Sequence, residues 1–311
     1  MTETHLTRER LRDRPLPMPE EGSKEQRGTV LVLGGSTDVP GAALLAGVAA
    51  LRAGAGRLRI ATVRSVAVPM ALALPEARVI GLAETQEGEI DAVQARRRLP
   101  ALAERCDAVL IGPGLSAGDA TLALTLALTL SLLPGQAPTS FVLDAGAIPG
   151  LGAHIEAARS CAGRVVITPH AGEMARLLDI DRDTVEADPL AAACKAADLL
   201  GCVVIMKGAQ SWIVNPDGER WRYAGGGVGL ATSGSGDALS GILAGLLARG
   251  TDAVTAALWG VYLHGEAGRR LAGRVGPIGF LAREISGEVP AILREAAPDP
   301  DDALRTPKSR R

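Results

Sequence analysis

The stretch "GVGLATSGSGDALSGILAGLLARG" (residues 227–250) joins a glycine-rich turn to a long apolar segment that is typical of a buried helix. Gly234, Ser235 and Gly236 come directly before Asp237. Two interpretations are open at this level. In the first, Asp237 caps the helix, because Asp is a favoured capping residue. In the second, backbone N–H groups and the helix dipole bind a phosphate while Asp237 takes up a proton, and glycine is present because a Cβ would block close approach.

Short apolar runs alternate with Ala/Leu-rich helical segments along the rest of the chain. The predicted strands lie in "TVLVLGG" (29–35), "RLRIATV" (57–63), "DAVLIGPG" (107–114), "TSFVLDAGAI" (139–148), "RVVITPHAGEMARLL" (164–178, a strand, a turn and a helix) and "GCVVIMKGAQ" (201–210). Helices are predicted over 40–56, 234–250 and 251–273. This alternation implies an α/β fold with a mostly parallel sheet covered by helices.

Glycines or functional side chains follow five of the predicted strands. Ligands of such sheets bind beyond the carboxyl ends of the strands, so these positions are expected to share one edge. They are Gly34-Gly35, Gly112-Pro113-Gly114, Asp144, Pro169-His170 and Lys207-Gly208. The sequence therefore predicts a ligand site at this edge of the sheet.

The length of 311 residues suits one large α/β domain or two small ones, and the absence of an internal repeat or long linker favours one. We expect that domain over 27–296. Residues 1–26, rich in Arg, Glu and Pro, are expected to form a mobile arm or a subunit-wrapping extension, and residues 297–311 a disordered tail.

Composition excludes several classes of protein. The net charge of −2 argues against nucleic-acid and membrane-surface binding, and 2% aromatic residues leave little material for stacking on bases. The N-terminus lacks the apolar region of a signal peptide, which predicts a cytoplasmic protein. The run "ATLALTLALTLSLL" (120–133) is too short to span a membrane and is expected to be a buried helix. The four cysteines show no metal or redox spacing and are expected to be small core residues.

The glycine turn does not match two better-known nucleotide motifs. No GK[ST] follows it at the spacing of a P-loop. The segment "GGSTDVPG" (34–41), after the first predicted strand, is not GxGxxG, so a nicotinamide site of the Rossmann type is poorly supported.

The stretch 227–250 resembles the signature of the ADP/ATP-dependent NAD(P)H-hydrate dehydratases, a branch of the ribokinase-like superfamily. Further segments resemble the family in the same order: 30–62, "VLIGPGL" (109–115), "FVLDAGAI" (141–148), "VVITPHAGEMARLL" (165–178), "VVIMKGAQSWIV" (203–214) and "AALWGVYLHGEAG" (256–268). The resemblance covers about residues 27–295. It implies a ribokinase-like three-layer α/β/α fold and, with no room for the epimerase that some members carry at the N-terminus, a stand-alone dehydratase.

The resemblance implies that the substrate is NADH or NADPH hydrated on the nicotinamide ring. ADP or ATP phosphorylates the ring hydroxyl, phosphate is eliminated, and the normal reduced cofactor returns. Phosphate is a far better leaving group than hydroxide. Such a reaction needs an anion cradle, here assigned to Gly234 and Gly236, and a base, here Asp237. Mg²⁺ is expected with the nucleotide, since divalent cations usually bridge phosphates, and the sequence shows no all-protein metal site.

The resemblance implies further ligand contacts at positions where a motif of this sequence matches one of the family. Hydrated-dinucleotide contacts match Ala42 in "PGAALL", Gly114 in "GPGL", His170 in "TPHAGE" and Asp237. Adenine-nucleotide contacts match Lys207, Gly208, Ala209, Gln210 and Ser211 in "KGAQS", together with Gly236. Alternatives stay open for three side chains. His170 is otherwise a turn histidine bonded to backbone, its neighbour Glu173 a capping-box residue, and Lys207 a solvated surface lysine.

The chain departs from the family pattern in two places. Asp144 matches the first carboxylate of an Asp-Ala-Asp segment, but Gly146 replaces the second. Gly227 and Val228 stand where the family has Asn and Pro, which bears on the choice of substrate.

Two other functions remain open beside the dehydratase. One is a small-molecule kinase of the same superfamily, acting on a sugar, a thiazole or a pyrimidine alcohol. The other is a nucleotide-binding regulatory protein without turnover, which has less need of a base at Asp237. The resemblance also predicts a homo-oligomer, most commonly a tetramer.

Overall fold

The computed structural model describes residues 3–18, 24–118, 121, 123–125, 139–161 and 163–296. The tail predicted over 297–311 lies outside the described residues, and so does most of the helix predicted over 120–133. Within the described chain, no helix combines the length and the apolar character needed to cross a membrane.

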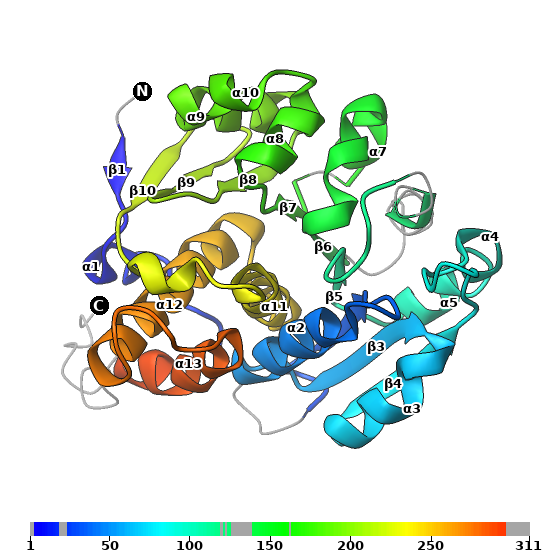
Figure 1. Cartoon of the computed structure of the whole chain (residues 1–311). Helices are drawn as coiled ribbons and strands as arrows, with labels where there is room; N and C mark the ends of the chain where they lie inside the picture. The colour runs from blue at the N-terminus through cyan, green and yellow to red at the C-terminus, as the bar shows by residue number, and fades with distance from the viewer. Residues whose placement is uncertain are drawn as a thin grey trace, which may run out of the picture.

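A ten-stranded sheet forms the centre of the molecule (Figure 1), in the order β1-β10-β9-β8-β7-β6-β5-β2-β3-β4. Of these ten strands, β9 alone runs antiparallel to its neighbours. Their bounds are β1 (Thr4–His5), β2 (Thr29–Leu33), β3 (Arg57–Val63), β4 (Ala77–Leu82), β5 (Ala108–Ile111), β6 (Ser140–Leu143), β7 (Val165–Ile167), β8 (Val203–Met206), β9 (Ser211–Val214) and β10 (Arg220–Tyr223). The predicted mostly parallel sheet is confirmed.

Helices cover both faces of the sheet because its central strands are apolar on both sides. In β2, Val30 and Val32 pack into one core, whereas Leu31 and Leu33 pack into the other. The first core is covered by α1 (Arg8–Leu11), α2 (Pro40–Arg52), α3 (Arg64–Ala73), α11 (Ser235–Ala248), α12 (Ala253–Arg274) and α13 (Ala282–Ala296). The second is covered by α4 (Ala92–Ala95), α5 (Leu99–Ala103), α7 (Ile155–Arg159), α8 (Ala171–Leu178), α9 (Arg182–Ala187) and α10 (Pro189–Leu200). The expected three-layer α/β/α architecture is confirmed.

Glycines let α11 lie directly on the backbone of α2. A Cβ added at Gly241 would lie 2.1 Å from the carbonyl oxygen of Ala46, and one at Gly245 would lie 2.4 Å from that of Ala50. Both helices begin at the carboxyl edge of the sheet, so this close packing fixes where the N-terminus of α11 stands.

We expect Gly241→Ala to lower the free energy of unfolding by about 3 kcal/mol, because the helices must separate to admit one methyl group. Ala is the better helix former, so the loss measures the clash and not propensity. Gly273→Ala in α12 is the matched control, because a Cβ there meets nothing within 4 Å. It should raise stability by about 0.5–1 kcal/mol in urea unfolding. Equal effects of the two substitutions would contradict this account of the packing.

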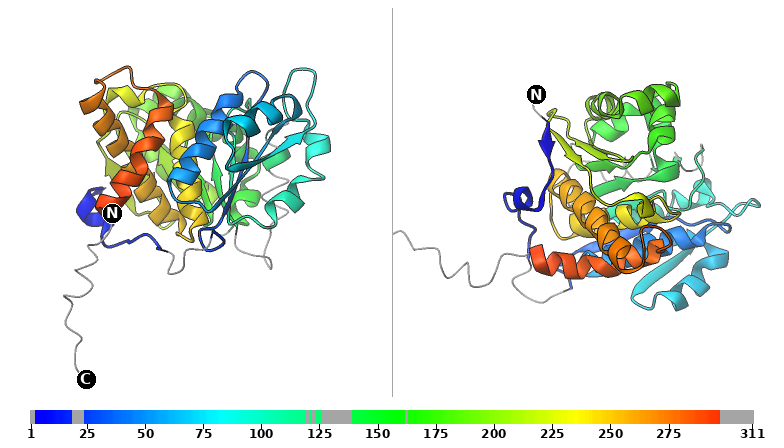
Figure 2. Two further views of the ribbon diagram at one scale, coloured as in Figure 1. Left: turned by 90° about the horizontal axis from the view of Figure 1, so that it is seen from below. Right: turned by 60° about the vertical axis from the view of Figure 1, so that its left-hand side comes forward.

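The N-terminal segment packs against its own chain along residues 4–14, so this part of it is not a free arm, whereas a role in wrapping another subunit stays a prediction (Figure 2). β1 pairs with β10, and α1 lies on α12. Leu6 and Leu11 are buried in the core, and the Trp259 indole donates a hydrogen bond of 2.7 Å to the carbonyl oxygen of Arg14. Two well-spaced leucines are enough to anchor a segment whose overall composition is polar.

Candidate active site

The loops that follow neighbouring strands line one edge of the sheet in the order of those strands. From β8 toward β2 they carry Lys207, His170, Asp144, Gly114 and Gly35. The N-terminus of α11 faces the middle of this row, since a Cβ added at Gly236 would lie 3.4 Å from Lys207 Nζ and 3.9 Å from Asp144 Oδ2. Lys207, the buried Asp144 carboxylate and the glycine turn therefore lie together at the edge of the sheet where the sequence predicts a ligand site.

Asp237 lies inside the first turn of α11 and is not its cap. The N-cap is Gly234, in the left-handed region at φ 88°, and no side chain caps this end. The Asp237 carboxylate accepts no hydrogen bond from any residue that the structure describes. The interpretation of Asp237 as a helix cap is therefore wrong, because the cap position needs a backbone conformation that favours glycine. The carboxylate remains available to a ligand.

Lys207 bridges two carboxylates beside the turn. Its Nζ lies 2.9 Å from Asp144 Oδ1 and 3.7 Å from Glu173 Oε2. Asp144 is buried and also accepts a 2.7 Å hydrogen bond from the Thr168 hydroxyl. The lysine side chain is only 23% exposed, so a solvated surface role is excluded. A cation held this firmly next to an open helix N-terminus provides positive potential for a phosphoryl group.

The pKa of Asp237 is raised to about 7. Burial is the largest cause, the negative charge of Asp144 adds to it, and the Lys207 ammonium works in the opposite direction. For Asp144 itself, burial raises the pKa, but the charge of Lys207 and the hydrogen bonds from Thr168 and Lys207 outweigh it, so its pKa ends below the ordinary value. The two carboxylates thus differ: Asp144 stays ionised, whereas Asp237 exchanges a proton near neutral pH.

His170 and Glu173 form the capping box of α8. His170 Nδ1 accepts hydrogen bonds from the backbone N–H groups of Gly172 at 3.0 Å and Glu173 at 3.4 Å. The backbone N–H of His170 in turn donates to Glu173 Oε2 at 2.9 Å. Burial is the largest cause and lowers the pKa of the imidazole, while the negative charge of Glu173 opposes it. The backbone-bonded interpretation of both residues is confirmed. The ring is still half exposed, so a contact with substrate stays a prediction.

The predicted substrate residues Ala42 and Gly114 lie against each other. A Cβ at Gly114 would be 3.1 Å from that of Ala42 and 2.4 Å from the carbonyl oxygen of Val39. Ala42 is buried in the first turn of α2, and its contact with substrate stays a prediction. Gly114 is required there both by its φ of 68° and by the close approach of the α2 backbone.

The "KGAQS" segment divides into two parts. Lys207 points into the charged cluster, Gly208, Ala209 and Gln210 form the exposed turn between β8 and β9, and Ser211 begins β9. Gln210 accepts a 3.1 Å hydrogen bond from Arg222 on β10. The structure therefore brings Lys207, but not Gly208, Ala209, Gln210 or Ser211, into the cluster around Asp237.

The two departures from the family pattern have different physical origins. At Gly146 a Cβ would lie 2.4 Å from the carbonyl oxygen of Leu115, so no second carboxylate fits this position in this chain. At Gly227, with φ 80°, a Cβ would meet nothing within 4 Å, and Val228 is 71% exposed. The first departure is steric, whereas the second leaves open space on the surface.

His264 on α12 supports the turn from behind and was not singled out from the sequence, which shows only a histidine within a helical motif. Its Nε2 lies 3.1 Å from the carbonyl oxygen of Ser235 and 3.0 Å from the Ser235 hydroxyl. A carbonyl only accepts, so Nε2 carries the proton. Burial, ahead of a smaller effect of Lys207, lowers the His264 pKa to about 4 against the opposing hydrogen bond to Ser235. The ring is therefore neutral at physiological pH.

We expect His264→Gln to reduce the loss in free energy of unfolding that the wild type shows as the pH becomes acidic. In the wild type the unfolded chain takes up a proton below pH ~6.5 while the folded ring stays neutral down to about pH 4. The free energy of unfolding therefore falls by up to about 3 kcal/mol as the pH drops through that range. Gln keeps a donor for Ser235 but does not titrate. Urea unfolding at pH 7.5, 5.5 and 4.5 measures the difference, and parallel profiles for the two proteins would count against it.

Among the residues that the structure describes, no three His, Cys, Asp or Glu side chains converge on a point that holds a metal ion. Asp144 and Glu173 are engaged by Lys207.

The fold and the glycine turn define a member of the ribokinase-like class. A ribokinase-like superfamily protein from Enterococcus faecalis aligns with a TM-score of 0.79 at 26% identity and covers 95% of this chain and 96% of that chain. The family model for NAD(P)H-hydrate dehydratase matches residues 30–291, and the chain belongs to this family.

Two relatives at higher identity have the same description. A protein from Xanthomonas campestris, named ADP-dependent (S)-NAD(P)H-hydrate dehydratase, is 53% identical over 290 residues, which are 93% of this chain and 95% of that protein. The crystal structure of the Bacillus subtilis ADP/ATP-dependent NAD(P)H-hydrate dehydratase, co-crystallised with ATP and Mg²⁺, has a TM-score of 0.78 at 30% identity. It covers 94% of this chain and 99% of that chain.

Proposed function

We propose that this chain returns hydrated NADH or NADPH to the reduced cofactor, using ADP or ATP as the phosphoryl donor. The observation that carries the proposal is the Asp237 carboxylate at a glycine turn beside Lys207, with a pKa of about 7 and no hydrogen bond from any described residue. The 53% identity to a protein named as such a dehydratase favours this function over a small-molecule kinase.

Asp237 acts as the base in the first step. It takes the proton of the ring hydroxyl as the oxygen attacks the terminal phosphorus of the nucleotide, and the shortened nucleotide leaves. In the second step the C–O bond breaks, phosphate departs with the bonding pair, and the neighbouring ring carbon loses a proton as the double bond forms. Overall one water equivalent is removed from the ring and one phosphoanhydride bond is hydrolysed.

The turn and Lys207 stabilise the negative charge of the transferring phosphoryl group. The N–H groups around Gly234 and Gly236 lie at the positive end of α11, and Lys207 adds a full charge next to Gly236. Magnesium, when bound to the nucleotide, neutralises further phosphate charge. With Ala42, Gly114 and His170 toward the substrate and residues 207–211 toward the nucleotide, two ligands would meet at Asp237.

A spectroscopic assay tests the function. The protein is mixed with hydrated NADH, Mg²⁺ and either ADP or ATP, and recovery of the reduced-nicotinamide absorbance is followed. We expect recovery with ADP as the better donor, in keeping with the description of the Xanthomonas relative. No recovery with either nucleotide, together with phosphorylation of another alcohol, would establish the kinase alternative instead.

The cytoplasmic location and the homotetramer expected from the resemblance are part of the same proposal. Light scattering coupled to gel filtration measures the assembly directly, and a monomeric mass would refute the tetramer.

A further inference from the structure

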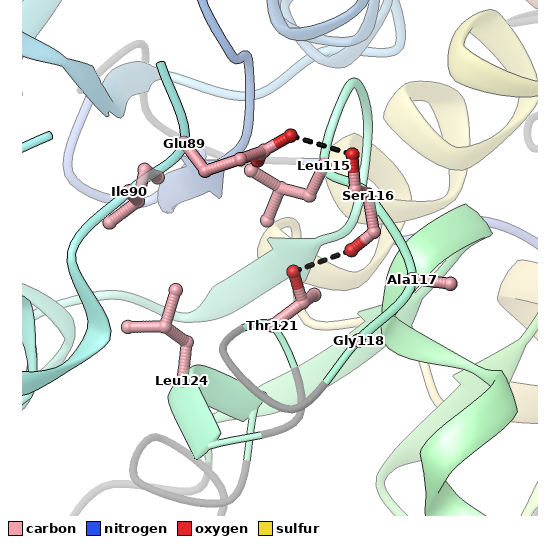
Figure 3. A pocket seen from close by; sticks show the side chains of 8 residues that line it. All are labelled: Glu89, Ile90, Leu115, Ser116, Ala117, Gly118, Thr121 and Leu124. Atoms are coloured by element: carbon pink, nitrogen blue, oxygen red, sulfur yellow. Dashed lines mark hydrogen bonds between the residues drawn. The ribbon is translucent and has the colours of Figure 1, made fainter. Parts of the chain in front are cut away.

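A pocket of about 150 Å³ lies just beyond the Gly114 loop (Figure 3). Its wall is mostly apolar, with Ile90 and Leu124 on one side and Leu115 on another, and the Glu89 carboxylate and the Ser116 hydroxyl stand at its edge. The lining residues are Glu89, Ile90, Leu115, Ser116, Ala117, Gly118, Thr121 and Leu124. An apolar pocket with a few oriented polar groups is typical of a ligand subsite.

The charge at this pocket is unbalanced. Glu89 Oε1 accepts a 2.6 Å hydrogen bond from the Ser116 hydroxyl, which fixes the carboxylate at the mouth. Among the residues that the structure describes, the lining contains no Lys or Arg, and Glu89 takes part in no ion pair. A held carboxylate without a cation accepts hydrogen bonds from hydroxyl groups and repels a second anion.

The loop that carries Glu89 is attached to the loop after β2. The Thr37 N–H and hydroxyl both donate to the carbonyl oxygen of Gly88, at 2.9 and 2.8 Å. Within the hairpin, the Thr85 N–H donates to the carbonyl oxygen of Glu89 at 2.8 Å. The position of the Glu89 carboxylate is therefore set by contacts on both sides, before any ligand is bound.

The order of the strands places this pocket on the substrate side of Asp237. The "KGAQS" segment, which the nucleotide would contact, follows β8, whereas Gly114 follows β5 and the Glu89 hairpin follows β4, in the opposite direction along the sheet. Gly146, two residues after Asp144, packs on the Leu115 carbonyl, so the pocket adjoins the catalytic cluster through one layer of backbone. With the nicotinamide ring at Asp237, the rest of the dinucleotide extends over Gly114 toward Glu89.

We propose that Glu89 binds the hydroxyl groups of the adenosine ribose of the substrate and thereby selects NADH-hydrate over NADPH-hydrate. The proposal rests on the proposed function. The apolar wall takes the adenine ring, and the free Glu89 oxygen accepts from the ribose 2′-hydroxyl, as acidic residues do in other dinucleotide sites. A 2′-phosphate would bring further negative charge to a carboxylate that forms no ion pair with any described residue.

The test compares kcat/KM for the two hydrates at low ionic strength, with saturating ADP and Mg²⁺. We expect the wild type to favour NADH-hydrate about tenfold or more. Glu89→Gln should reduce this preference about tenfold, mainly through a lower KM for NADPH-hydrate, and raising the salt concentration should narrow the wild-type ratio. Glu87→Gln is the matched control, because Glu87 is an exposed acid of the same hairpin outside the pocket.

The outcomes separate the two levels of the proposal. Turnover of both hydrates at equal kcat/KM, or an unchanged ratio in Glu89→Gln with turnover intact, overturns the role of Glu89 and leaves the dehydratase function standing. Absence of turnover with either hydrate refutes the proposed function instead. Ser116→Ala gives a second measurement: it frees the carboxylate, so the KM for NADH-hydrate should rise severalfold, whereas a purely structural hairpin would leave both KM values unchanged.

Discussion

Replacement of Asp237 by Asn is expected to lower kcat/KM for the hydrated cofactor by about a thousandfold or more, since it removes the base and keeps the shape of the side chain. Asn cannot take up the hydroxyl proton. The wild-type kcat/KM should rise with pH through about 7, where the Asp237 carboxylate ionises, and the variant should lose this dependence. Initial rates across pH 5.5–9 measure both effects.

The same substitution should make the protein more stable above neutral pH. Asp237 has a folded-state pKa of about 7, raised first by burial, so the folded chain holds this proton more tightly than the unfolded chain does. Its ionisation therefore costs stability as pH rises from about 4 to about 7, and the cost stays constant above that. We expect a gain of about 1–3 kcal/mol at pH 8 for Asp237→Asn, after allowance for solvent screening. A variant that is inactive because it is unfolded would instead lose stability, and one that keeps a tenth of the activity would remove Asp237 from its role.

The edge of the sheet and the residues on it were predictable because strand ends are local features. An apolar run that stops at glycine or at a functional group gives both the end of the strand and its position in a parallel sheet. Asp144, His170, Gly114 and Lys207 were found in this way, each at the end of its strand. The order of these residues across the sheet could not be predicted in this way, because it depends on the order of the strands and not on the motifs themselves.

The features that were missed depend on tertiary contacts or on backbone angles. The N-cap of α11 is Gly234 because its φ is 88°, which the letters "SGSGD" do not specify, so the sequence left a capping role for Asp237 open. The ion pair of Lys207 with Asp144 joins residues 63 positions apart. The contact between His264 and Ser235 likewise joins two separate helices. In each case the residue type was visible in the sequence but the partner was not.

Removal of the positive charge at position 207 is the second large effect we expect. Lys207→Met should lower kcat/KM about a hundredfold or more, because the phosphoryl group loses a cation beside Gly236 and three carboxylates are left close together. The substitution should also raise the apparent pKa at which kcat/KM increases on the acid side of its pH profile (the acid limb), since the Lys207 ammonium lowers the pKa of Asp237. Lys195→Met on the exposed side of α10 is the matched control and should change neither quantity.

Substitution of Asp144 should shift the apparent pKa in the direction opposite to that expected for Lys207→Met. The negative charge of Asp144 raises the pKa of Asp237, so Asp144→Asn should move the acid limb downward while Lys207→Met moves it upward. A general loss of structure would not shift the two profiles in opposite directions, and circular dichroism at each pH checks that both variants are folded. If both substitutions shift the limb the same way, or neither shifts it, the ionisation of Asp237 is not governed by this pair. The proton affinity of Asp237 would then have to follow from burial alone, and the buried Asp144–Lys207 contact would serve to hold the loops after β6 and β8 together.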